Sequence, residues 1–279
     1  MRGLLTLGVA LAALMMPFAA QAQEAETPDI EMWRLDCGAI AISNLDAFSD
    51  GYLYEGREGT FTNSCYLIRH GDRHLLWDAG LPSALIDAPV TQGIFTVSLE
   101  RNIASQLTEI GVAVEDVDFL GLSHHHFDHV GQAPDLAAST LLLNARDIAA
   151  LREGANPQSA QILAHWLEGG GTVTDFSGDH DVFGDGSVVI LAMPGHTPGH
   201  SSLLVRLPET GNVLLTGDLY HFREQIENEG VPRFNTDRTD TLASFERFLQ
   251  IDQALDAMIV IQHDPGDLER LPVFPESAR

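Results

Sequence analysis

The run SHHHFDH at residues 123–129 constrains this chain more than any other segment. It fits the pattern His-x-His-x-Asp-His and follows residues 117–122, whose apolar character predicts a buried strand. Imidazole and carboxylate side chains packed this closely suit zinc and similar divalent ions. A polar cluster where a strand becomes a loop is typical of a functional site on a rigid scaffold. We therefore expect a metal site at the end of this strand.

The first residues predict a targeting segment. Arg2 gives a small positive charge, residues 4–20 are apolar, and residues 20–22 (Ala-Gln-Ala) fit a cleavage site. We predict a secretory signal peptide over residues 1–22 and a single domain over residues 23–279. The alternative is an uncleaved membrane anchor, for which the apolar stretch is short. The mature protein is expected to be secreted, most simply to a periplasm, without membrane insertion after cleavage.

The chain is strongly acidic. It carries 40 Asp and Glu residues against 15 basic residues, a formal net charge of −25, and every basic residue is Arg. Such a surface repels nucleic acid and anionic membranes, so we expect no nucleic-acid partner. The composition favours a small neutral substrate, although high-salt surroundings or genomic base composition could also produce it.

The sequence leaves the state of its two cysteines open. Cys37 and Cys65 both lie in strand-like segments. They could pair in an oxidising compartment, but these segments suit buried free thiols at least as well. Neither is near a histidine cluster in the sequence, so we expect neither to bind a metal.

Apolar periodicity divides the rest of the chain into short elements. Strands are predicted at residues 32–42, 64–69, 73–77, 117–122, 140–143, 188–192, 201–207, 212–216 and 257–261, and helices at residues 98–110, 145–152, 160–167 and 241–255. The long segment 44–63 is rich in Gly and aromatic residues, which could line a pocket or fix the segment to its own domain. Two strand-rich halves, each closed by helices, predict an α/β fold of two packed sheets with helices outside.

Three later strands each end in a candidate ligand. These residues could bind metal together with the cluster at residues 124–129. Strand ends on one rim of a sheet converge in space, which lets residues distant in sequence build one site. Together the candidate metal ligands are His124, His126, Asp128, His129, His196, Asp218 and His263. A single zinc takes about four ligands and a catalytic zinc leaves one position for water. Seven donors therefore suit two ions that share a bridging carboxylate and a bridging hydroxide.

In these motifs the chain resembles the metallo-β-lactamase superfamily. The matching segments are Asp-Ala-Gly at 78–80, the histidine cluster at 124–129, Gly-His-Thr-Pro-Gly-His at 195–200, Thr-Gly-Asp at 216–218, and His263. The resemblance implies an αββα sandwich of two mixed β-sheets flanked by helices, with two metal ions at one edge of the sheets. It further implies that His124, His126 and His196 hold one zinc, that Asp128, His129 and His263 hold the second, and that Asp218 bridges them. Iron, manganese or cobalt could replace zinc on this ligand set.

Three further polar residues belong to these motifs. His125 lies between two ligands and should point away from the metals. His200 is expected to act through a hydrogen bond rather than as a ligand. Asp78 is expected either to orient a ligand from behind the site or to be only a turn residue before Gly80.

Within the superfamily the chain is most similar to the N-acyl homoserine lactonases. The bridging Asp218 argues against β-lactam cleavage, because true β-lactamases of the family lack it. RNA-processing members prefer basic surfaces, and oxygen-reducing flavin partners usually replace a ligand His by Glu where this chain has His126. Glyoxalase II enzymes share the seven ligands but add a C-terminal basic region that holds glutathione, whereas the residues after His263 are net acidic. The phrase Ser-His-x-His-Phe-Asp-His is typical of the lactonases.

This resemblance implies hydrolysis of the lactone ring of N-acyl homoserine lactones by a metal-bridging hydroxide, which would quench quorum signalling. Asp128 could relay a proton to the leaving oxygen. Lactonases commonly place a tyrosine three residues after the bridging Asp, but here that position is His221 and Tyr220 comes one residue earlier. Either side chain could stabilise the oxyanion, with a slight preference for His221. The acyl tail would lie against Phe48, Phe61 and the region 150–180.

Two other readings remain open from the sequence. One is a periplasmic hydrolase of another lactone, ester or thioester, similar to glyoxalase II. The other is a metal-binding protein without catalysis, although a binder gains nothing from an open site with room for water. The expected partner is a small neutral acyl-lactone substrate, and a homodimer is also conceivable.

Overall fold

Runs of apolar residues build two β-sheets in residues 29–279, which together with Gly3 are the residues that this computed structural model describes. The predicted signal peptide, apart from Gly3, lies outside them. The first sheet has the strand order β4-β5-β1-β2-β3-β6-β7-β8 and the second has the order β13-β12-β11-β10-β9. The strands of the first sheet are β1 (Ile30–Ile42), β2 (Gly59–His70), β3 (Arg73–Trp77), β4 (Val90–Gln92), β5 (Phe95–Ser98), β6 (Phe119–Gly121), β7 (Thr140–Asn144) and β8 (Val173–Phe176). Those of the second are β9 (His180–Asp181), β10 (Val188–Ala192), β11 (Ser201–Leu207), β12 (Gly211–Leu215) and β13 (Met258–Val260).

Both sheets are mixed. Strands β1, β2 and β3 pair antiparallel, whereas β3, β6, β7 and β8 pair in parallel. In the second sheet β9 to β12 pair antiparallel and β13 joins β12 in parallel. The parallel pairs matter for the site because parallel strands end at the same edge of a sheet.

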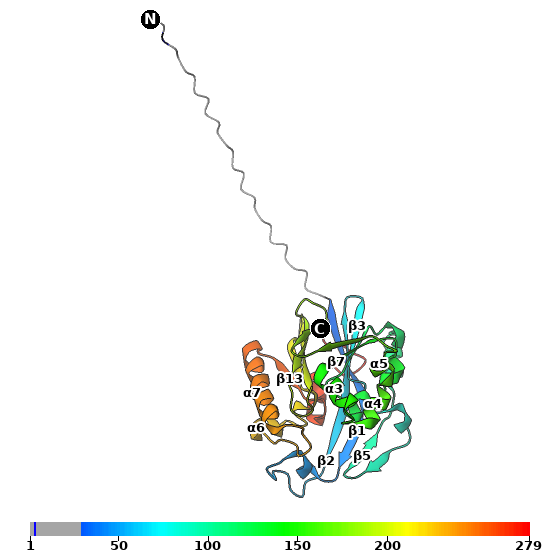
Figure 1. Cartoon of the computed structure of the whole chain (residues 1–279), viewed down its shortest axis with the longest axis vertical. Coiled ribbons are helices and arrows are strands. Elements are labelled where there is room, and N and C mark those ends of the chain that lie inside the picture. Colours follow the sequence, from blue (N-terminus) through cyan, green and yellow to red (C-terminus); the bar gives the residue numbers. More distant parts are fainter. Residues whose placement is uncertain (1–2, 4–28) are drawn as a thin grey trace.

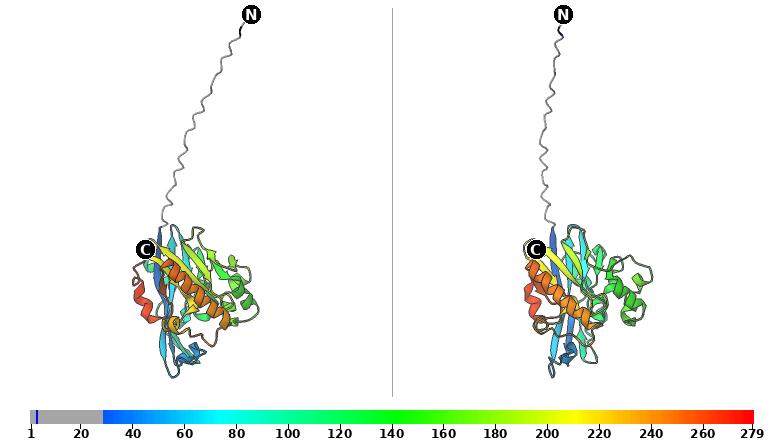
Figure 2. Two further views of the ribbon diagram at one scale, coloured as in Figure 1. Left: turned by 90° about the vertical axis from the view of Figure 1, so that its left-hand side faces the viewer. Right: turned by 60° about the vertical axis from the view of Figure 1, so that its left-hand side comes forward.

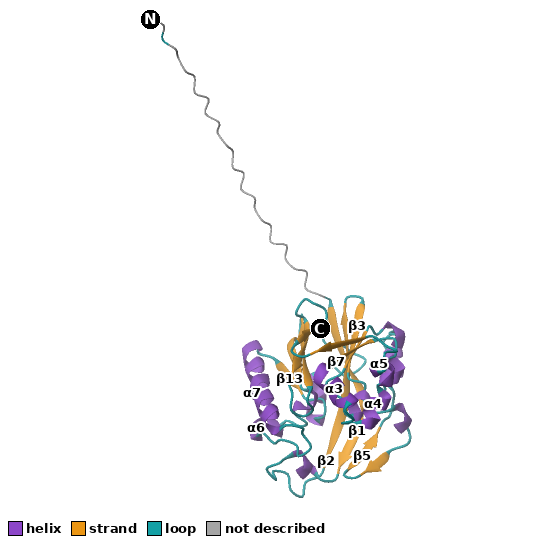
Figure 3. Ribbon diagram, viewed as in Figure 1, coloured by secondary structure: helices purple, strands orange, loops and turns teal. Residues whose placement is uncertain are grey.

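Helices cover the outer faces of the two sheets. They are α1 (Ile103–Glu109), α2 (Phe127–Val130), α3 (Ala145–Arg152), α4 (Pro157–Ile162), α5 (Ala164–Leu167), α6 (Glu224–Asn228) and α7 (Arg238–Leu255). Figure 1 and Figure 3 show α6 and α7 on one side of the sheets and α3, α4 and α5 on the other. The predicted αββα sandwich is therefore confirmed. No helix among the described residues is long and apolar enough to span a membrane.

Strand β11 shows why the second sheet lies inside the sandwich. Leu203 and Val205 point toward the first sheet and pack in one cluster with Trp77 of β3. Leu204 points the opposite way and packs with Phe245 of α7, since side chains alternate along a strand. Both faces of the strand are thus buried, and Figure 2 shows α7 lying across this sheet.

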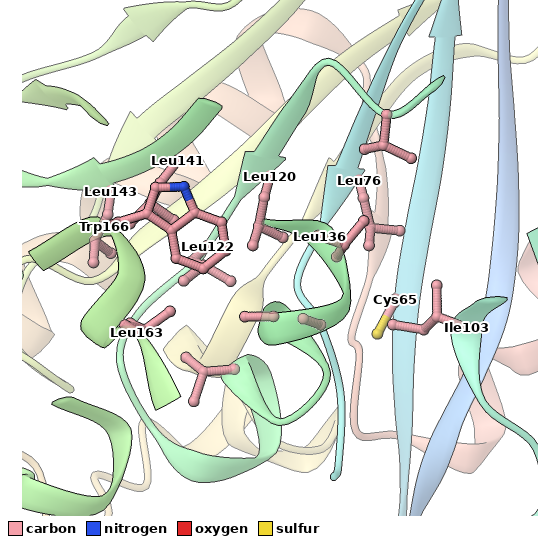
Figure 4. Packing of buried hydrophobic residues seen from close by; sticks show 14 of the residues in the cluster. Cys65, Leu76, Ile103, Leu120, Leu122, Leu136, Leu141, Leu143, Leu163 and Trp166 are labelled. Atoms are coloured by element: carbon pink, nitrogen blue, oxygen red, sulfur yellow. The ribbon is translucent and has the colours of Figure 1, made fainter. Parts of the chain in front are cut away.

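The outer face of the first sheet packs on its own helices. Leu120 of β6 and Leu143 of β7 contribute to one cluster with Leu163 and Trp166 from the α4–α5 region (Figure 4). The indole Nε1 of Trp166 donates a hydrogen bond to the Ser139 carbonyl at 3.0 Å, so the polar edge of this buried ring is satisfied.

Several predicted elements differ from the observed ones at their ends. The helix expected at residues 98–110 shrinks to α1, because β5 extends to Ser98 and the side chain of Asn102 caps the helix by accepting a hydrogen bond from the Ser105 N–H at 2.8 Å. The segment 44–63, expected to be irregular, yields the start of β2 at Gly59. The helix expected at residues 160–167 divides into α4 and α5. The hairpin of β4 and β5 was not predicted at all.

A disulfide joins the first two strands. Cys37 of β1 and Cys65 of β2 are buried and bonded, with 5.8 Å between their Cα atoms. The reading of two buried free thiols is therefore wrong. Cys37 lies at a register shift of β1, next to Gly38 with its φ of +123°, and this local irregularity is what the periodicity of the strand could not reveal.

Candidate metal centre

Five strand ends deliver the candidate ligands and their supports to one edge of the sandwich. The cluster at residues 124–129 follows β6, and Asp78 follows its parallel neighbour β3. In the second sheet His196 follows β10, Asp218 follows β12, and His263 follows the parallel strand β13. All seven predicted ligands except His126 are buried, and His126 is intermediate.

The first group consists of three imidazoles and a carboxylate. The His126 Nδ1 atom lies 2.9 Å from the Nε2 atoms of both His124 and His196, and those two Nε2 atoms are 3.2 Å apart. The Asp218 Oδ2 atom lies 3.3 Å from the His196 Nε2 and 3.6 Å from the His124 Nε2. These four side chains can hold one metal ion.

The second group faces the other oxygen of the same carboxylate. The Asp218 Oδ1 atom lies 3.0 Å from the Nε2 atoms of both His129 and His263, which are 3.3 Å apart. The Asp128 Oδ2 atom lies 3.6 Å from each of these two nitrogens. Asp128, His129 and His263 can hold a second ion, and Asp218 lies between the two groups.

The far nitrogen of most of these rings is held in place. The Nδ1 atom of His129 lies 2.9 Å from the Asp78 Oδ2, and that of His263 lies 2.8 Å from the Thr62 carbonyl oxygen. The His196 Nδ1 atom lies 2.9 Å from the Asn235 Oδ1. Because each of these partners accepts a hydrogen bond, Nδ1 carries a proton and Nε2 is the nitrogen that faces the site.

The electrostatics of the cluster fit two bound cations. Burial lowers the pKa of His124 and His126 well below the usual value, so these imidazoles are neutral and each has a lone pair that it can offer to an ion. Burial also opposes protonation of His129 and His263, but the nearby carboxylates, Asp218 and Asp128 first among them, together outweigh burial and raise the pKa of both. Converging lone pairs in one group and converging negative charge in the other both call for positive ions between them.

Asp78 supports the second group from behind. Its Oδ1 accepts a hydrogen bond from the Ser123 N–H at 2.7 Å, and its Oδ2 contacts His129 and accepts one from the Gln262 side chain at 2.9 Å. The expectation that Asp78 orients a ligand is therefore the one that the geometry favours. Gln262 was missed in the sequence; its only signal was its place immediately before His263.

Gln262 ties the two halves of the site together. Its Oε1 accepts hydrogen bonds from the Gly217 N–H at 3.0 Å and from the indole of Trp77 at 3.3 Å. Its Nε2 donates to the Ser64 carbonyl at 3.1 Å. The side chain is completely buried, with partners from both sheets.

His125 and His200 lie as the sequence predicted. The His125 Nδ1 atom lies 3.0 Å from the Asp147 Oδ2, so this ring turns away from both metal groups. The His200 Nδ1 contacts the Met193 carbonyl at 2.9 Å, and its Nε2 accepts a hydrogen bond from the Asp218 backbone N–H at 2.9 Å. Burial lowers the pKa of His200 to about 4, which keeps it neutral in this role.

The structure separates the two candidates that follow Asp218. The Tyr220 ring stacks on Phe245 of α7 with 4.4 Å between ring centroids, within the cluster behind the second sheet, so Tyr220 does not reach the site. The His221 Nε2 atom lies 3.3 Å from the Asp218 Oδ2, and its ring is nearly parallel to that of His263 at 5.7 Å. The backbone is extended at Tyr220, which turns adjacent side chains in opposite directions. Of the two candidates, the structure therefore brings His221 to the site and leaves Tyr220 away from it.

An apolar cavity opens onto the metal groups. It has a volume of about 260 Å³ and is lined by Ile40, Ile42, Phe48, Phe61, Phe95, His126, Phe127, Asp128, Asp218, His221, Phe234 and His263. The expected aromatic wall of Phe48 and Phe61 is thus present. Residues 150–180, also expected there, do not line this cavity; Phe95 of β5 and Phe234 are among the residues that do.

Comparisons with known proteins agree with this architecture. The family model described as "Metallo-beta-lactamase superfamily" matches residues 59–263. An N-acyl homoserine lactonase from a Bacillus species is 29% identical over 76% of this chain and 85% of its own length. The N-acyl homoserine lactonase AttM of Azorhizobium caulinodans is 26% identical over 72% of this chain and 81% of its own length.

Two solved structures are similar in fold. An N-acyl homoserine lactone hydrolase, with the product N-hexanoyl-L-homoserine at its catalytic metal centre, has a TM-score of 0.76 and 22% identity, covering 88% of this chain and 98% of its own. The dizinc quorum-quenching lactonase AidC has a TM-score of 0.64 and 16% identity, covering 89% of this chain and 90% of its own.

Proposed function

This chain belongs to the metallo-β-lactamase superfamily, and we propose that it is a hydrolase that opens the lactone ring of N-acyl homoserine lactones with two divalent metal ions. The relatives named above are lactonases of this substrate class, which supports the choice of reaction. The observation that carries the proposal is Asp218. Its two oxygens face two separate ligand groups, and its side chain lines an apolar cavity.

The ligand groups divide the proposed metals between them. His124, His126 and His196 would hold one ion, Asp128, His129 and His263 the other, and Asp218 both. Zinc suits these imidazole and carboxylate donors, and iron, manganese and cobalt are compatible with them. Bound ions of this kind lower the pKa of water and polarise a carbonyl oxygen, which is the chemistry that ester hydrolysis requires.

Side chains of the protein would transfer the proton that the reaction requires. In the reaction a water oxygen adds to the lactone carbonyl carbon, the ring C–O bond breaks, and the ring oxygen leaves with a proton. Asp128 lines the cavity beside the second group and is the carboxylate available to carry that proton. The product is an acyl homoserine with one carboxylate, so each turnover releases one proton to neutral solution.

His221 is the proposed donor to the developing oxyanion. It lines the cavity next to Asp218, and burial lowers its pKa to about 4, so at neutral pH its imidazole carries a single N–H. A hydrogen bond aimed at charge that develops only in the transition state accelerates the chemical step more than it tightens binding.

The cavity wall supports a neutral acyl substrate. Its lining is largely aliphatic and aromatic, and among the described residues no Arg side chain belongs to it. An anionic thioester such as a glutathione conjugate would need a cation there, so the glyoxalase II-like alternative lacks the partner that its substrate requires.

A substrate panel tests this proposal. Metal-loaded protein would be given N-hexanoyl homoserine lactone, γ-butyrolactone, S-lactoylglutathione and nitrocefin, with proton release as the common measurement for the lactones. We expect ring opening of the acyl homoserine lactone at a kcat/KM well above those of the other three. Preferential cleavage of S-lactoylglutathione with both metals bound would instead favour the thioesterase alternative.

A further inference from the structure

We propose that Gln225 is a positioning residue for the reaction, because it determines where the imidazole of His221 lies. Gln225 is the second residue of α6, and its side chain is completely buried. It neither lines the cavity nor belongs to a metal group. The inference rests on the proposed function, in which His221 donates to the oxyanion, and adds a residue that acts through His221.

Both polar atoms of the Gln225 amide bind backbone groups. Its Oε1 accepts a hydrogen bond from the His221 N–H at 2.7 Å. Its Nε2 donates to the Phe48 carbonyl and to the Gly230 carbonyl, each at 3.0 Å. Phe48 is 177 positions away in the chain, whereas His221 and Gly230 flank α6. One side chain therefore holds three segments of the chain together.

Two of these segments carry side chains that contact each other at the site. The His221 ring lies edge-on to the Phe48 ring, with 4.9 Å between the ring centroids, and both rings line the cavity. Gln225 thus fixes the backbone on both sides of this contact. Loss of the amide would release both segments, and the imidazole would move relative to Asp218.

The His221 ring has little else to hold it. Its Nδ1 is buried and has no hydrogen-bond partner among the described residues, and its Nε2 faces the Asp218 Oδ2 at 3.3 Å. By contrast, an oxygen atom holds the Nδ1 of each of His129, His196 and His263. The position of His221 therefore depends on its backbone and on ring packing. A misplacement of about 1 Å can cost about 100-fold in rate.

Gln106 provides a matched control away from the site. It is buried in α1, and its Oε1 accepts a hydrogen bond from the Asp36 N–H at 2.9 Å. Its Nε2 donates to the carbonyls of Asp36 and Asn102 at 2.8 and 3.3 Å. Gln106 also holds three backbone groups, but none of these residues lines the cavity or belongs to a metal group.

The first test compares Gln225→Met with Gln106→Met in metal-loaded enzyme, using N-hexanoyl homoserine lactone. Both variants should unfold at a lower temperature, since each leaves three backbone groups without partners. Only Gln225→Met should lower kcat, by about tenfold, with a smaller change in KM, because His221 acts in the transition state. An equal fall in kcat in both variants, or a loss confined to KM, would overturn the inference. If Gln225→Met does not fold, the shorter amides Gln225→Asn and Gln106→Asn replace the pair.

A double-mutant cycle shows whether Gln225 acts through His221. In the His221→Phe background, Gln225→Met should lower kcat by less than about twofold, because residues that act as one unit are not additive. The same tenfold loss in both backgrounds would contradict this role. So would a His221→Phe variant with unchanged kcat, and in both cases the lactonase proposal would stand.

NMR of the histidine rings tests the positioning separately from activity. The ring signal of His221 in zinc-loaded protein is identified by its absence from His221→Phe. Gln225→Met should shift this signal, and Gln106→Met should leave it in place. An unshifted signal in Gln225→Met would overturn the inference. If the signal shifts but the unaltered enzyme opens no acyl homoserine lactone, the proposed function fails while the positioning of His221 by Gln225 stands.

Discussion

The Asp78 Oδ2 atom lies 2.9 Å from the His129 Nδ1 atom, although the two residues are 51 positions apart in the chain. Asp78 has a φ of +63°, a left-handed conformation that turns the chain sharply after β3 and aims the carboxylate at the histidine. This pair fixes the tautomer of one predicted ligand and connects the turn after β3 with the cluster after β6.

Replacement of Asp78 by Asn should weaken the second metal group selectively. The amide is uncharged and supports the His129 N–H less well, so we expect metal affinity at that group to fall by about 10–100-fold. Equilibrium dialysis followed by metal analysis measures this. Asp185→Asn is the matched control, because Asp185 also pairs with a histidine, His70 at 2.7 Å, but away from the site. Equal metal loss in both variants would contradict the role of Asp78.

Asp218→Asn should remove the shared ligand of the two groups. Metal content should drop below two ions per chain and the lactonase rate should fall by about 100-fold or more, since even residues behind metal ligands contribute 10–100-fold. Both quantities would be measured on the same preparation. Full activity with both metals retained would refute the bridging role.

The pair Tyr220→Phe and His221→Phe tests which side chain assists the reaction. His221→Phe should lower kcat by about 100-fold, the usual cost of losing one donor to an oxyanion. Tyr220→Phe should leave kcat close to that of the unaltered enzyme, because the Tyr220 ring lies against α7 rather than in the cavity. A larger loss in the tyrosine variant would reverse the assignment.

Removal of the disulfide should destabilise the fold. The bond closes a loop between residues 28 positions apart, so the double variant Cys37→Ser/Cys65→Ser should lose about 3 kcal/mol of unfolding free energy. Urea unfolding with and without reductant measures the change. Reductant should destabilise the unaltered protein and leave the double variant unaffected; the same response in both would show that the bond is absent in solution.

Export is a further expectation that can be checked directly. Expression of the full chain in a bacterium with a periplasm should yield a periplasmic product that begins near Gln23, because residues 20–22 fit a cleavage site. Mass spectrometry of the fractionated protein decides this. A full-length product in the membrane fraction would favour the uncleaved anchor.

The sequence predicted the fold and the convergence of the candidate ligands because each donor follows an apolar strand. Helix α3 and strands β10 and β11 have the predicted bounds, since their periodicity is unbroken. The β4–β5 hairpin was missed because β4 is three exposed residues without an apolar face. The hairpin contributes to the cavity because of its position in space, and local sequence patterns do not predict that position.

The sequence also could not predict which of the two side chains, Tyr220 or His221, faces the cavity. Adjacent residues point to opposite sides of an extended backbone, and only the position of α7 determines which side is the cavity. Gln262 was missed for a related reason. The role of this buried amide depends on hydrogen bonds to four residues that are distant in the chain. A single sequence does not reveal these contacts.

The division of the ligands between the sheets has a thermodynamic consequence. Each metal group combines residues from the segment after β6, which includes α2, with residues that follow strands of the second sheet. An ion bound in either group would therefore cross-link the two layers of the sandwich, and the free energy of ligation would enter the folding equilibrium itself. In such a protein the melting temperature rises with the concentration of free metal. Removal of the metals by a chelator would therefore weaken the packing between the two sheets as well as abolish hydrolysis.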